Sequence, residues 1–304
     1  MARCFVTRQL PGDALERLRA VHEVDTWPQR LPPAPPDLRA HAEEAEGLLT
    51  MLTDRVDEQL LESCPRLKAI SNYAVGYDNI DIHAAARRGI QVGNTPDVLT
   101  EATADLAFAL LLAAAPRLPA AIESVRTGDW LSWEPGRDLG YDVHGATLGI
   151  VGPGRIGSAV ARRAQGFEMT VIDPDEVALD SLLRRSDFVS LHVPLTPDTH
   201  HLIDARALGL MRPTAILVNT ARGPIVDQAA LREALTDGTI AGAALDVTDP
   251  EPLPADDPLL SAPNLIVAPH IGSATHSTRG RMADLAVDNL LAALAGRAMP
   301  HRVI

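Results

Sequence analysis

The sequence contains a single lysine, Lys68, among 304 residues. It therefore has no phosphate-binding loop of the G-x-x-x-x-G-K-[ST] type, and Schiff-base chemistry would depend on that one side chain. Its two cysteines, Cys4 and Cys64, do not form a C-x-x-C pair, which argues against a zinc or dithiol motif. We expect both to be buried apolar thiols, and nothing in their number requires an oxidising compartment.

Long apolar runs and basic tracts are also lacking. The longest apolar run, residues 106–115, is well short of the roughly 18–20 residues that a membrane-spanning helix needs. The first ten residues are too polar for a signal peptide. The net charge of −13 disfavours general binding to nucleic acid or to anionic membranes. We therefore expect a cytoplasmic protein that binds neither.

What the sequence does contain is a regular alternation of strand and helix patterns, in a chain long enough for two domains. In the first part, strand patterns at 3–9, 47–52, 67–74 and 90–94 alternate with helical patterns at 12–21, 56–64 and 81–89. The proline-rich residues 31–37 are interpreted as a loop within this part. Such alternation predicts an α/β fold with a parallel sheet and helices on both of its faces.

The alternation of short strand and helix patterns stops near Thr100, where residues 100–115 predict one long, largely buried helix. Residues 126–143 are irregular and contain two of the three tryptophans. Strand patterns then resume at 146–152, 168–173, 188–194, 214–220, 240–247 and 264–270, with helical patterns between them at 155–166, 177–187 and 227–238. Apolar residues at helical spacing predict a last helix over 277–296.

A glycine turn follows the strand pattern at 146–152. Gly152, Gly154 and Gly157 form G-x-G-x-x-G between a strand and a helix, which is the context that a dinucleotide-binding turn requires. The free N–H groups at the start of such a helix bind pyrophosphate. Pro153 removes one N–H, but we expect binding to survive because Arg155 and Ile156 supply the donors after the second glycine.

Asp173 ends the next strand, 21 residues after Gly152. A carboxylate there can accept hydrogen bonds from both adenosine ribose hydroxyls, whereas it would repel a 2′-phosphate. Asp175 adds to that repulsion, and no arginine stands beside Asp173 to reverse it. The sequence thus favours NAD(H) over NADP(H). The alternative is a glycine-rich turn without a ligand.

Three polar residues, Arg222, Glu251 and His270, come after three successive apolar strand patterns. In an open parallel sheet, ligands bind outside the carboxyl ends of the strands, so these side chains can share one site. A guanidinium can hold the carboxylate of a 2-oxo acid, and an imidazole can protonate its carbonyl. A carboxylate beside the imidazole fixes its tautomer and favours its charged form. Taken singly, each residue could be structural, but their coincidence with the glycine turn favours an active site.

Six other histidines can be placed from the sequence. His192 also ends a strand pattern, and we expect it near the ribose or nicotinamide of the cofactor. His276 should lie on or near the first turn of the last helix. We expect surface or loop positions for His83, His144, His200 and His201.

At this point the chain resembles the D-isomer-specific 2-hydroxyacid dehydrogenases. Six segments carry the resemblance, NYAVGYDNID, VGPGRIG, SDFVSLHVPLTPDTHHLI, LVNTARGPIVD, AALDVTDPEPLP and VAPHIGSAT, and it extends over nearly the whole chain. Within that family the chain is most similar to glyoxylate/hydroxypyruvate reductases, through TPDVLTEATADLA, GDWLSWEP, DVTDPEPLPADDPLL and HIGSATHSTR.

The resemblance implies two doubly wound parallel-sheet domains of the Rossmann/flavodoxin type. Residues 1–95 with 280–304 would form the substrate domain, and 96–279 an inserted NAD-binding domain, with active-site closure between them. His270 would donate the proton, Glu251 would pair with it, and Arg222 would hold the substrate carboxylate. The other substrate-binding residues would be Leu52, the backbone N–H groups of Val75 and Gly76, and Trp133, which in eukaryotic relatives reaches the partner subunit's site.

The same resemblance implies a larger set of cofactor contacts and a homodimer. The contacts would be made by Thr103, Gly152, Gly154, Arg155, Ile156, Gly157, Asp173, His192, Val193, Pro194, Thr199, Thr220, Ala221, Arg222, Asp246, His270, Gly272 and Ser273. No metal is implied. The ligands would be NAD(H) and a small 2-oxo or 2-hydroxy acid such as glyoxylate or hydroxypyruvate.

The chain departs from the family pattern in two places. Between Asp173 and Ser186 the family usually has about ten more residues, so we expect a short strand at 177–179 without the helix that normally precedes it. This departure alters one wall of the adenine pocket. Asp173 also differs from the NADP-type pattern of the eukaryotic reductases, so the subfamily likeness does not by itself determine the cofactor.

Two kinds of alternative remain open. One is another reaction on the same scaffold, such as oxidation of 3-phosphoglycerate, D-lactate or phosphite. Arg55 is the only cation near Leu52 and Val75, which disfavours doubly charged substrates. The other is an NAD-sensing binding protein without enzymatic activity, like the transcriptional corepressors that share this fold. Partner-binding tails would favour it, and we expect none.

Overall fold

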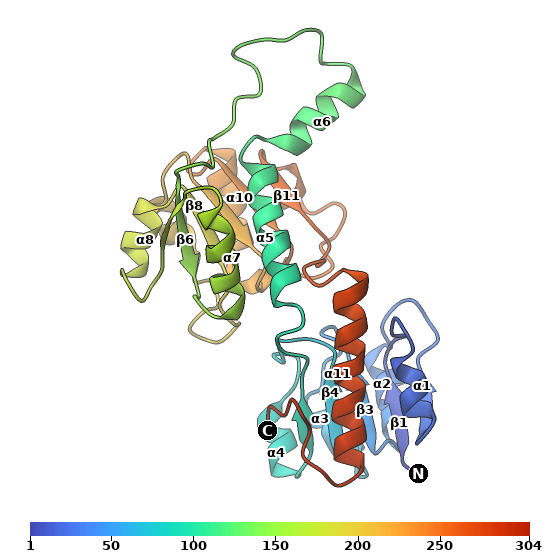
Figure 1. Ribbon diagram of the computed structural model, residues 1–304. Coiled ribbons are helices and arrows are strands. Elements are labelled where there is room, and N and C mark those ends of the chain that lie inside the picture. The colour runs from blue at the N-terminus through green and yellow to red at the C-terminus, as the bar shows by residue number, and fades with distance from the viewer. The chain divides into compact units, whose positions relative to one another are not determined.

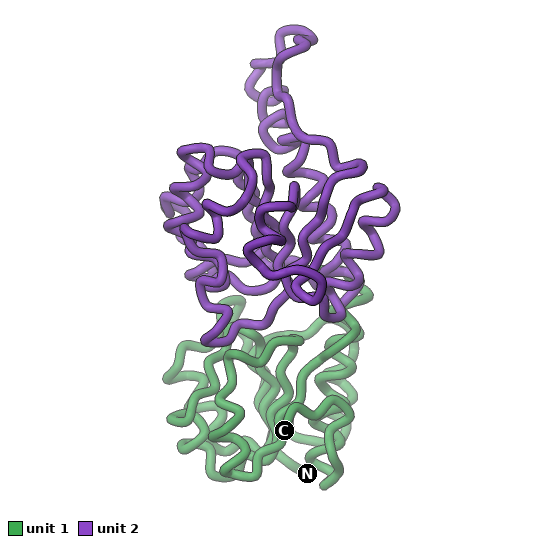
Figure 2. The backbone as a smooth tube through the Cα atoms, turned by 90° about the vertical axis from the view of Figure 1, so that its left-hand side faces the viewer, with its two compact units in different colours: residues 1–99, 274–304 green, residues 100–273 purple.

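The computed structural model describes all residues, 1–304, and forms two compact units. Unit 1 comprises residues 1–99 and 274–304, and unit 2 comprises residues 100–273 (Figure 2). The chain therefore leaves unit 1 once and returns to it once, so that unit 2 is an insertion.

Unit 1 is built on a five-stranded, wholly parallel sheet with the order β2-β1-β3-β4-β5. The strands are β1 (Arg3–Val6), β2 (Glu23–Thr26), β3 (Gly47–Thr50), β4 (Ala69–Asn72) and β5 (Gln91–Gly93). The helices are α1 (Ala14–Arg19), α2 (Pro35–Ala42), α3 (Glu58–Ser63), α4 (Ile82–Arg87) and α11 (His276–Leu294). Buried residues of α1 and α11 form the core on one face, and those of α2, α3 and α4 form it on the other. The predicted parallel α/β organisation is confirmed here.

Two elements of unit 1 were not predicted, namely β2 and α2. The proline-rich residues 31–37 are only in part the expected loop, because α2 begins at Pro35. Proline is tolerated in the first turn of a helix, where its missing N–H would have no partner in any case. The two cysteines are buried as expected, and burial raises the pKa of the Cys4 thiol to about 12.

The C-terminal tail completes unit 1 by pairing with its edge strand. Arg302 forms an antiparallel bridge with Gly93, and Val303 N donates to Val92 O at 2.7 Å. The pairing covers the open side of β5 with backbone hydrogen bonds, as edge strands commonly need. It also brings the end of the chain beside the residues that follow β5.

Unit 2 contains a six-stranded parallel sheet with the order β11-β10-β9-β8-β6-β7 (Figure 1). The strands are β6 (Thr147–Val151), β7 (Thr170–Ile172), β8 (Phe188–Leu191), β9 (Ile216–Asn219), β10 (Gly242–Leu245) and β11 (Leu265–Val267). The helices are α5 (Thr100–Ala114), α6 (Leu118–Thr127), α7 (Arg155–Gln165), α8 (Leu179–Arg185), α9 (Ala205–Leu210) and α10 (Gln228–Thr236), with short 3-10 turns at Gly223–Ile225 and Pro258–Ser261. Helices α5 and α7 cover one face, and α8, α9 and α10 cover the other.

The segment after Asp173 agrees with only one of its two predictions. The helical pattern at 177–187 is confirmed by α8, whereas residues 177–179 do not form the expected short strand, because α8 begins at Leu179. Leu179, Leu182 and Leu183 follow helical spacing, and the latter two are fully buried against the sheet, so a helical face is the conformation that buries them. Helix α9, in contrast, was not predicted.

Helices α5 and α6 contrast in their burial. No single helix is long and apolar enough to cross a membrane, and these two reach that length and composition only when joined across a 59° bend. Helix α5 lies in the core of unit 2, whereas α6 has no buried residue. In Figure 1, α6 and the irregular chain that follows it extend beyond the sheet layer of their own unit.

Candidate active site

The glycine turn connects β6 to α7 at the point where the strand order of unit 2 reverses, between β6 and β8. Gly152 has φ +99°, and a Cβ added there would lie 2.8 Å from the carbonyl carbon of His192. A Cβ on Gly157 would lie 2.2 Å from Gly152 O. These two glycines therefore permit close packing of β6, α7 and the end of β8.

Gly154 is different, because a Cβ added to it would meet no atom within 4 Å. It is the N-cap of α7 and makes no side-chain cap, so the first N–H groups of the helix receive no partner from a capping side chain. Open space above a glycine at a helix N-terminus is what the close approach of a pyrophosphate requires. The turn thus fits a dinucleotide on its geometry as well as its sequence.

Asp173 lies at the end of β7, beside β6. Its Oδ1 accepts a hydrogen bond from Asp175 N at 2.9 Å, and its carbonyl accepts from Glu176 N and Val177 N. The shortened segment therefore begins with a tight turn anchored on Asp173. A half-buried carboxylate held in this way is suited to accept a hydrogen bond from a ribose hydroxyl.

His270 and Glu251 are brought together after β11 and β10. Their Nδ1 and Oε1 atoms are in direct hydrogen-bond contact, and both side chains are partly exposed. Because Nδ1 is occupied, Nε2 is the ring nitrogen from which His270 can give up a proton. His270 has φ +53°, a conformation that is uncommon for a residue with a side chain and that tends to occur at functional sites.

Asp246 fixes the turn that carries His270. Its Oδ1 and Oδ2 accept from Ile271 N at 2.7 Å and Gly272 N at 2.8 Å, and its carbonyl accepts from His270 N at 2.9 Å. Burial raises the pKa of the Asp246 carboxyl, and the hydrogen bonds from the two N–H groups lower it in part. Thr103 Oγ1 donates to Gly272 O at 3.2 Å, so α5 holds the same turn from the other side.

Arg222 follows β9, the strand next to β10. Asn219 supports it, because its Nδ2 donates to Arg222 O at 2.8 Å and its Oδ1 accepts from Ala221 N at 3.0 Å. Sequence reasoning missed Asn219, and the polar residue at the end of the apolar run LVNT was the available signal. Gly223 allows this loop to meet the next one, since a Cβ there would lie 2.0 Å from Thr248 O.

His192 ends β8 and packs beside the glycine turn. Its Nε2 is 2.8 Å from Ser190 Oγ, and burial lowers the pKa of the imidazole to about 4. The ring is therefore neutral near pH 7, which suits hydrogen bonding rather than ion pairing. Thr199 Oγ1 donates to Pro194 O at 2.6 Å and closes the loop that follows.

Unit 2 thus gathers most of the predicted cofactor contacts around the carboxyl ends of its strands. Thr220 Oγ1 is buried without a hydrogen-bond partner, as a residue awaiting a ligand would be. Leu52, Val75 and Gly76 belong to unit 1, in the loops after β3 and β4. Trp133 is 82% exposed in the irregular chain after α6.

The five other histidines that were placed from the sequence lie where they were expected. His276 is the first residue of α11, and His83, His144, His200 and His201 are exposed. No group of three or more His, Cys, Asp or Glu side chains is placed to hold a metal ion.

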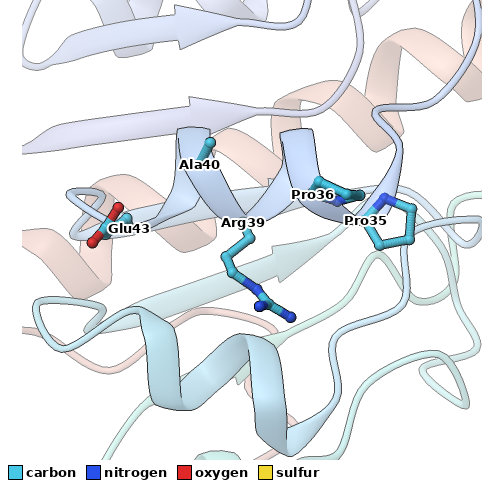
Figure 3. A pocket seen from close by; sticks show the side chains of 5 residues that line it. All are labelled: Pro35, Pro36, Arg39, Ala40 and Glu43. Carbon is cyan, nitrogen blue, oxygen red and sulfur yellow. The ribbon is translucent and has the colours of Figure 1, made fainter.

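A separate depression on α2 in unit 1 is lined by Pro35, Pro36, Arg39, Ala40 and Glu43 (Figure 3). All five come from one helix and the residue after it. None of them is among the residues predicted for the active site.

Known proteins are similar to this chain over nearly its whole length. A family model described as the NAD binding domain of D-isomer specific 2-hydroxyacid dehydrogenases matches residues 108–272. A glyoxylate reductase of Korarchaeum cryptofilum is 49% identical over 99% of this chain and 95% of its own length. The match therefore extends over both units.

Solved structures are also similar to this chain over nearly its whole length. A protein from Thermus thermophilus has a TM-score of 0.93 and 49% identity, covering 99% of this chain and all of that one. An NADPH-dependent glyoxylate/hydroxypyruvate reductase from Sinorhizobium meliloti, in complex with NADP and malonate, has a TM-score of 0.88 and 35% identity over 99% of this chain and 96% of that one. The chain belongs to the D-isomer specific 2-hydroxyacid dehydrogenase family, and its unit 2 contains the NAD(P)-binding domain of that family.

Proposed function

We propose that this enzyme reduces glyoxylate or hydroxypyruvate to the D-2-hydroxy acid with NADH. The single observation that carries the proposal is the His270–Glu251 pair, at the same sheet end as the glycine turn. His270 follows β11, in a turn that Asp246 holds, and Glu251 follows β10, the strand next to that of Arg222. The glyoxylate reductase named above supports this choice of substrate.

Each residue has a distinct part in the proposed reaction. The bound dinucleotide supplies the hydride that reaches C2 of the oxo acid. His270 donates its proton from Nε2 to the carbonyl oxygen, and Glu251 keeps the imidazole in the required orientation. Arg222 binds the substrate carboxylate, because a planar guanidinium can form two parallel hydrogen bonds with it. The N–H groups of Val75 and Gly76 bind that carboxylate as well, and Leu52 lines the pocket.

The preference for NADH over NADPH is part of the proposal. Asp173 would accept from the ribose hydroxyls, and Asp175 and Glu176 add negative charge where a 2′-phosphate would lie. The Sinorhizobium meliloti protein, by contrast, is NADPH-dependent. The cofactor contacts proposed are those named from the sequence. Among them, Thr103 and Asp246 hold the turn of Gly272 beside the proposed nicotinamide site.

Domain roles and assembly complete the proposal. Residues 1–95 with 280–304 would bind the substrate and 96–279 the cofactor, with boundaries within a few residues of the two structural units. A homodimer would cover the apolar side chains of α6 and the chain after it, of which Trp130, Leu131 and Trp133 are 63%, 85% and 82% exposed. Exposed apolar patches of this kind mark protein interfaces. Light scattering should give twice the 32.4 kDa chain mass.

One panel of substrates tests the proposed activity. The purified enzyme is mixed with NADH or NADPH and with glyoxylate, hydroxypyruvate or pyruvate, and cofactor oxidation is followed at 340 nm. The reverse arm offers NAD⁺ with D-lactate, 3-phosphoglycerate and phosphite. We expect the highest kcat/KM with NADH and glyoxylate or hydroxypyruvate.

Two other outcomes of this panel would contradict the proposed activity, and each points to a different function. Preferred oxidation of 3-phosphoglycerate, D-lactate or phosphite would replace the proposed reaction by another of the same family. NADH binding in calorimetry without turnover of any substrate would indicate an NAD-sensing binding protein instead.

A further inference from the structure

Three consecutive carbonyl groups after β4 are each held by a hydrogen bond within unit 1. Ala74 O accepts from Thr95 N at 2.9 Å, and Val75 O accepts from Asn94 Nδ2 at 2.7 Å. Gly76 O accepts from Asn72 Nδ2 at 2.9 Å. Two of these three donors belong to the segment that follows β5, so β4 and β5 fix this loop jointly.

These bonds determine where two N–H groups point. In a planar trans peptide the N–H is directed opposite to the C=O, so holding Ala74 O orients Val75 N–H and holding Val75 O orients Gly76 N–H. Neither N–H donates to an acceptor within the protein. Both residues are half-buried, which makes the pair a preformed donor site for an anion.

Asn94 is itself held by residues from the far end of the chain. Its N–H donates to His301 O at 3.1 Å, and its carbonyl accepts from Asn289 Nδ2 at 2.9 Å. Asn289 Oδ1 in turn accepts from His301 N at 3.0 Å. The three residues form a closed set of hydrogen bonds that joins β5, α11 and the C-terminal tail.

Asn289 occupies an unusual place for a polar side chain. It is completely buried on α11, where buried amides are costly unless they are hydrogen-bonded. A Cβ added to Gly93 would lie 2.8 Å from Asn289 Nδ2, so glycine at that position makes room for the amide. By holding Asn94 O, Asn289 also orients the Thr95 N–H toward Ala74 O.

We propose that Asn94 is a positioning residue for the substrate carboxylate, and that Asn289 and the C-terminal tail keep Asn94 in place. The inference rests on the proposed function, in which the Val75 and Gly76 N–H groups bind that carboxylate. Without Asn94 Nδ2 the Val75–Gly76 peptide is free to rotate, and its N–H no longer has a fixed direction. The side chain acts through the peptide and does not touch the substrate.

The decisive comparison is between Asn94→Ala and Gln91→Ala. Asn94→Ala removes the bond to Val75 O. Gln91→Ala removes two bonds that β5 makes with the same tail, to Arg297 O and from Met299 N, both at 3.2 Å, without touching Asn94. Gln91→Ala is therefore a matched control for loosening of the tail.

We expect Asn94→Ala to raise KM for glyoxylate by about tenfold, as the loss of one well-oriented bond to a charged group would do, with kcat changed by less than about twofold. The affinity for NADH should stay constant, because the cofactor contacts are elsewhere. Oxamate, a non-reducible carboxylate analogue, should bind the enzyme–NADH complex more weakly by the same factor. Gln91→Ala should leave both KM and oxamate affinity within about twofold of wild type.

The result that would overturn the proposal is equal KM for Asn94→Ala and Gln91→Ala, or a parallel loss of affinity for NADH in Asn94→Ala. Asn289→Leu should raise KM in the same direction, and combining it with Asn94→Ala should add little, since both act on one peptide. If Asn94→Ala does not fold, Asn94→Ser, too short to reach Val75 O, replaces it. A wild-type enzyme that turns over no oxo acid would overturn the proposed function itself.

Discussion

The first strand–helix turn of each unit shows how one topology serves two purposes. In unit 2 the turn between β6 and α7 consists of Gly152, Pro153 and Gly154, and the space next to Gly154 is open to a ligand. In unit 1, residues 7–13 separate β1 from α1, and Thr7 Oγ1 is buried in a hydrogen bond to Asp54. The same place in the sheet is thus open for the proposed dinucleotide in one unit and is filled by the protein's own side chains in the other.

The carboxyl ends of the two sheets differ in the same sense. Unit 2 presents ionisable side chains there, Arg222, Glu251 and His270, which can bind charge and move a proton. Unit 1 presents the peptide N–H groups of Val75 and Gly76, oriented by Thr95 N–H and Asn94 Nδ2, which can bind an anion but cannot exchange a proton. A shared architecture therefore places functional groups, whereas the residue types at the strand ends decide the chemistry.

The largest expected effect comes from removing the proposed proton donor of unit 2. His270→Gln should lower kcat by about 10²-fold or more, the contribution expected of a general acid. The measurement is kcat at saturating glyoxylate and NADH. His144→Gln is the control, because His144 is exposed and lies outside the site. A kcat for His270→Gln near that of wild type would remove His270 from the role.

The next effect concerns the glycine turn. Gly154→Ala should weaken NADH binding by about tenfold or more, since its Cβ would occupy the space that the pyrophosphate approaches. The melting temperature should not fall, because that Cβ meets no protein atom within 4 Å. Fluorescence titration gives the Kd. Gly209→Ala, equally uncrowded on α9, should leave Kd unchanged, and an equal Kd for both variants would contradict the assignment.

A smaller change, in the preference for NADH over NADPH, is expected on substitution of Asp173. Asp173→Ala should reduce the NADH/NADPH ratio of kcat/KM by about tenfold, because it removes both a ribose hydrogen bond and a charge that repels phosphate. Asp175→Ala tests charge without the ribose contact and should have a weaker effect. A ratio that is unchanged in Asp173→Ala would show that this carboxylate does not select the cofactor.

The sequence was sufficient for the glycine turn, the parallel sheets and the residues at the strand ends, because strand periodicity and strand-end position are local signals. It failed where the signal was weak or contradictory. Strand β2 (Glu23–Thr26) is polar and at the sheet edge, and α2 begins in a run of prolines. The short strand expected at 177–179 is absent, because α8 begins at Leu179 and buries Leu182 and Leu183 against the sheet.

Long-range polar contacts were beyond sequence reasoning altogether. Asn94 and Asn289 are 195 residues apart, and their hydrogen bond depends on α11 packing against the sheet of unit 1. Asn219 and Asp246 orient the loops that carry Arg222 and His270 through bonds to backbone atoms. No composition or periodicity encodes such contacts, since they follow from tertiary packing.

The smallest expected effect is on the pH dependence of the unfolding free energy, to which His192 of unit 2 contributes. His192 in unit 2 has a pKa of about 4, compared with an ordinary value of 6.5, so the unfolded chain binds the proton more readily. Its contribution to stability is complete above about pH 6.5 and is lost as pH falls toward 4, amounting to about 1–3 kcal/mol. The raised pKa values of Asp54 in unit 1 and Asp246 act in the opposite direction, so wild-type stability alone does not isolate the imidazole. The difference in urea unfolding free energy between pH 7.5 and 5 should therefore shrink in His192→Gln and persist in His144→Gln. An unchanged difference in His192→Gln would mean that this ring is not buried in its neutral form beside the glycine turn.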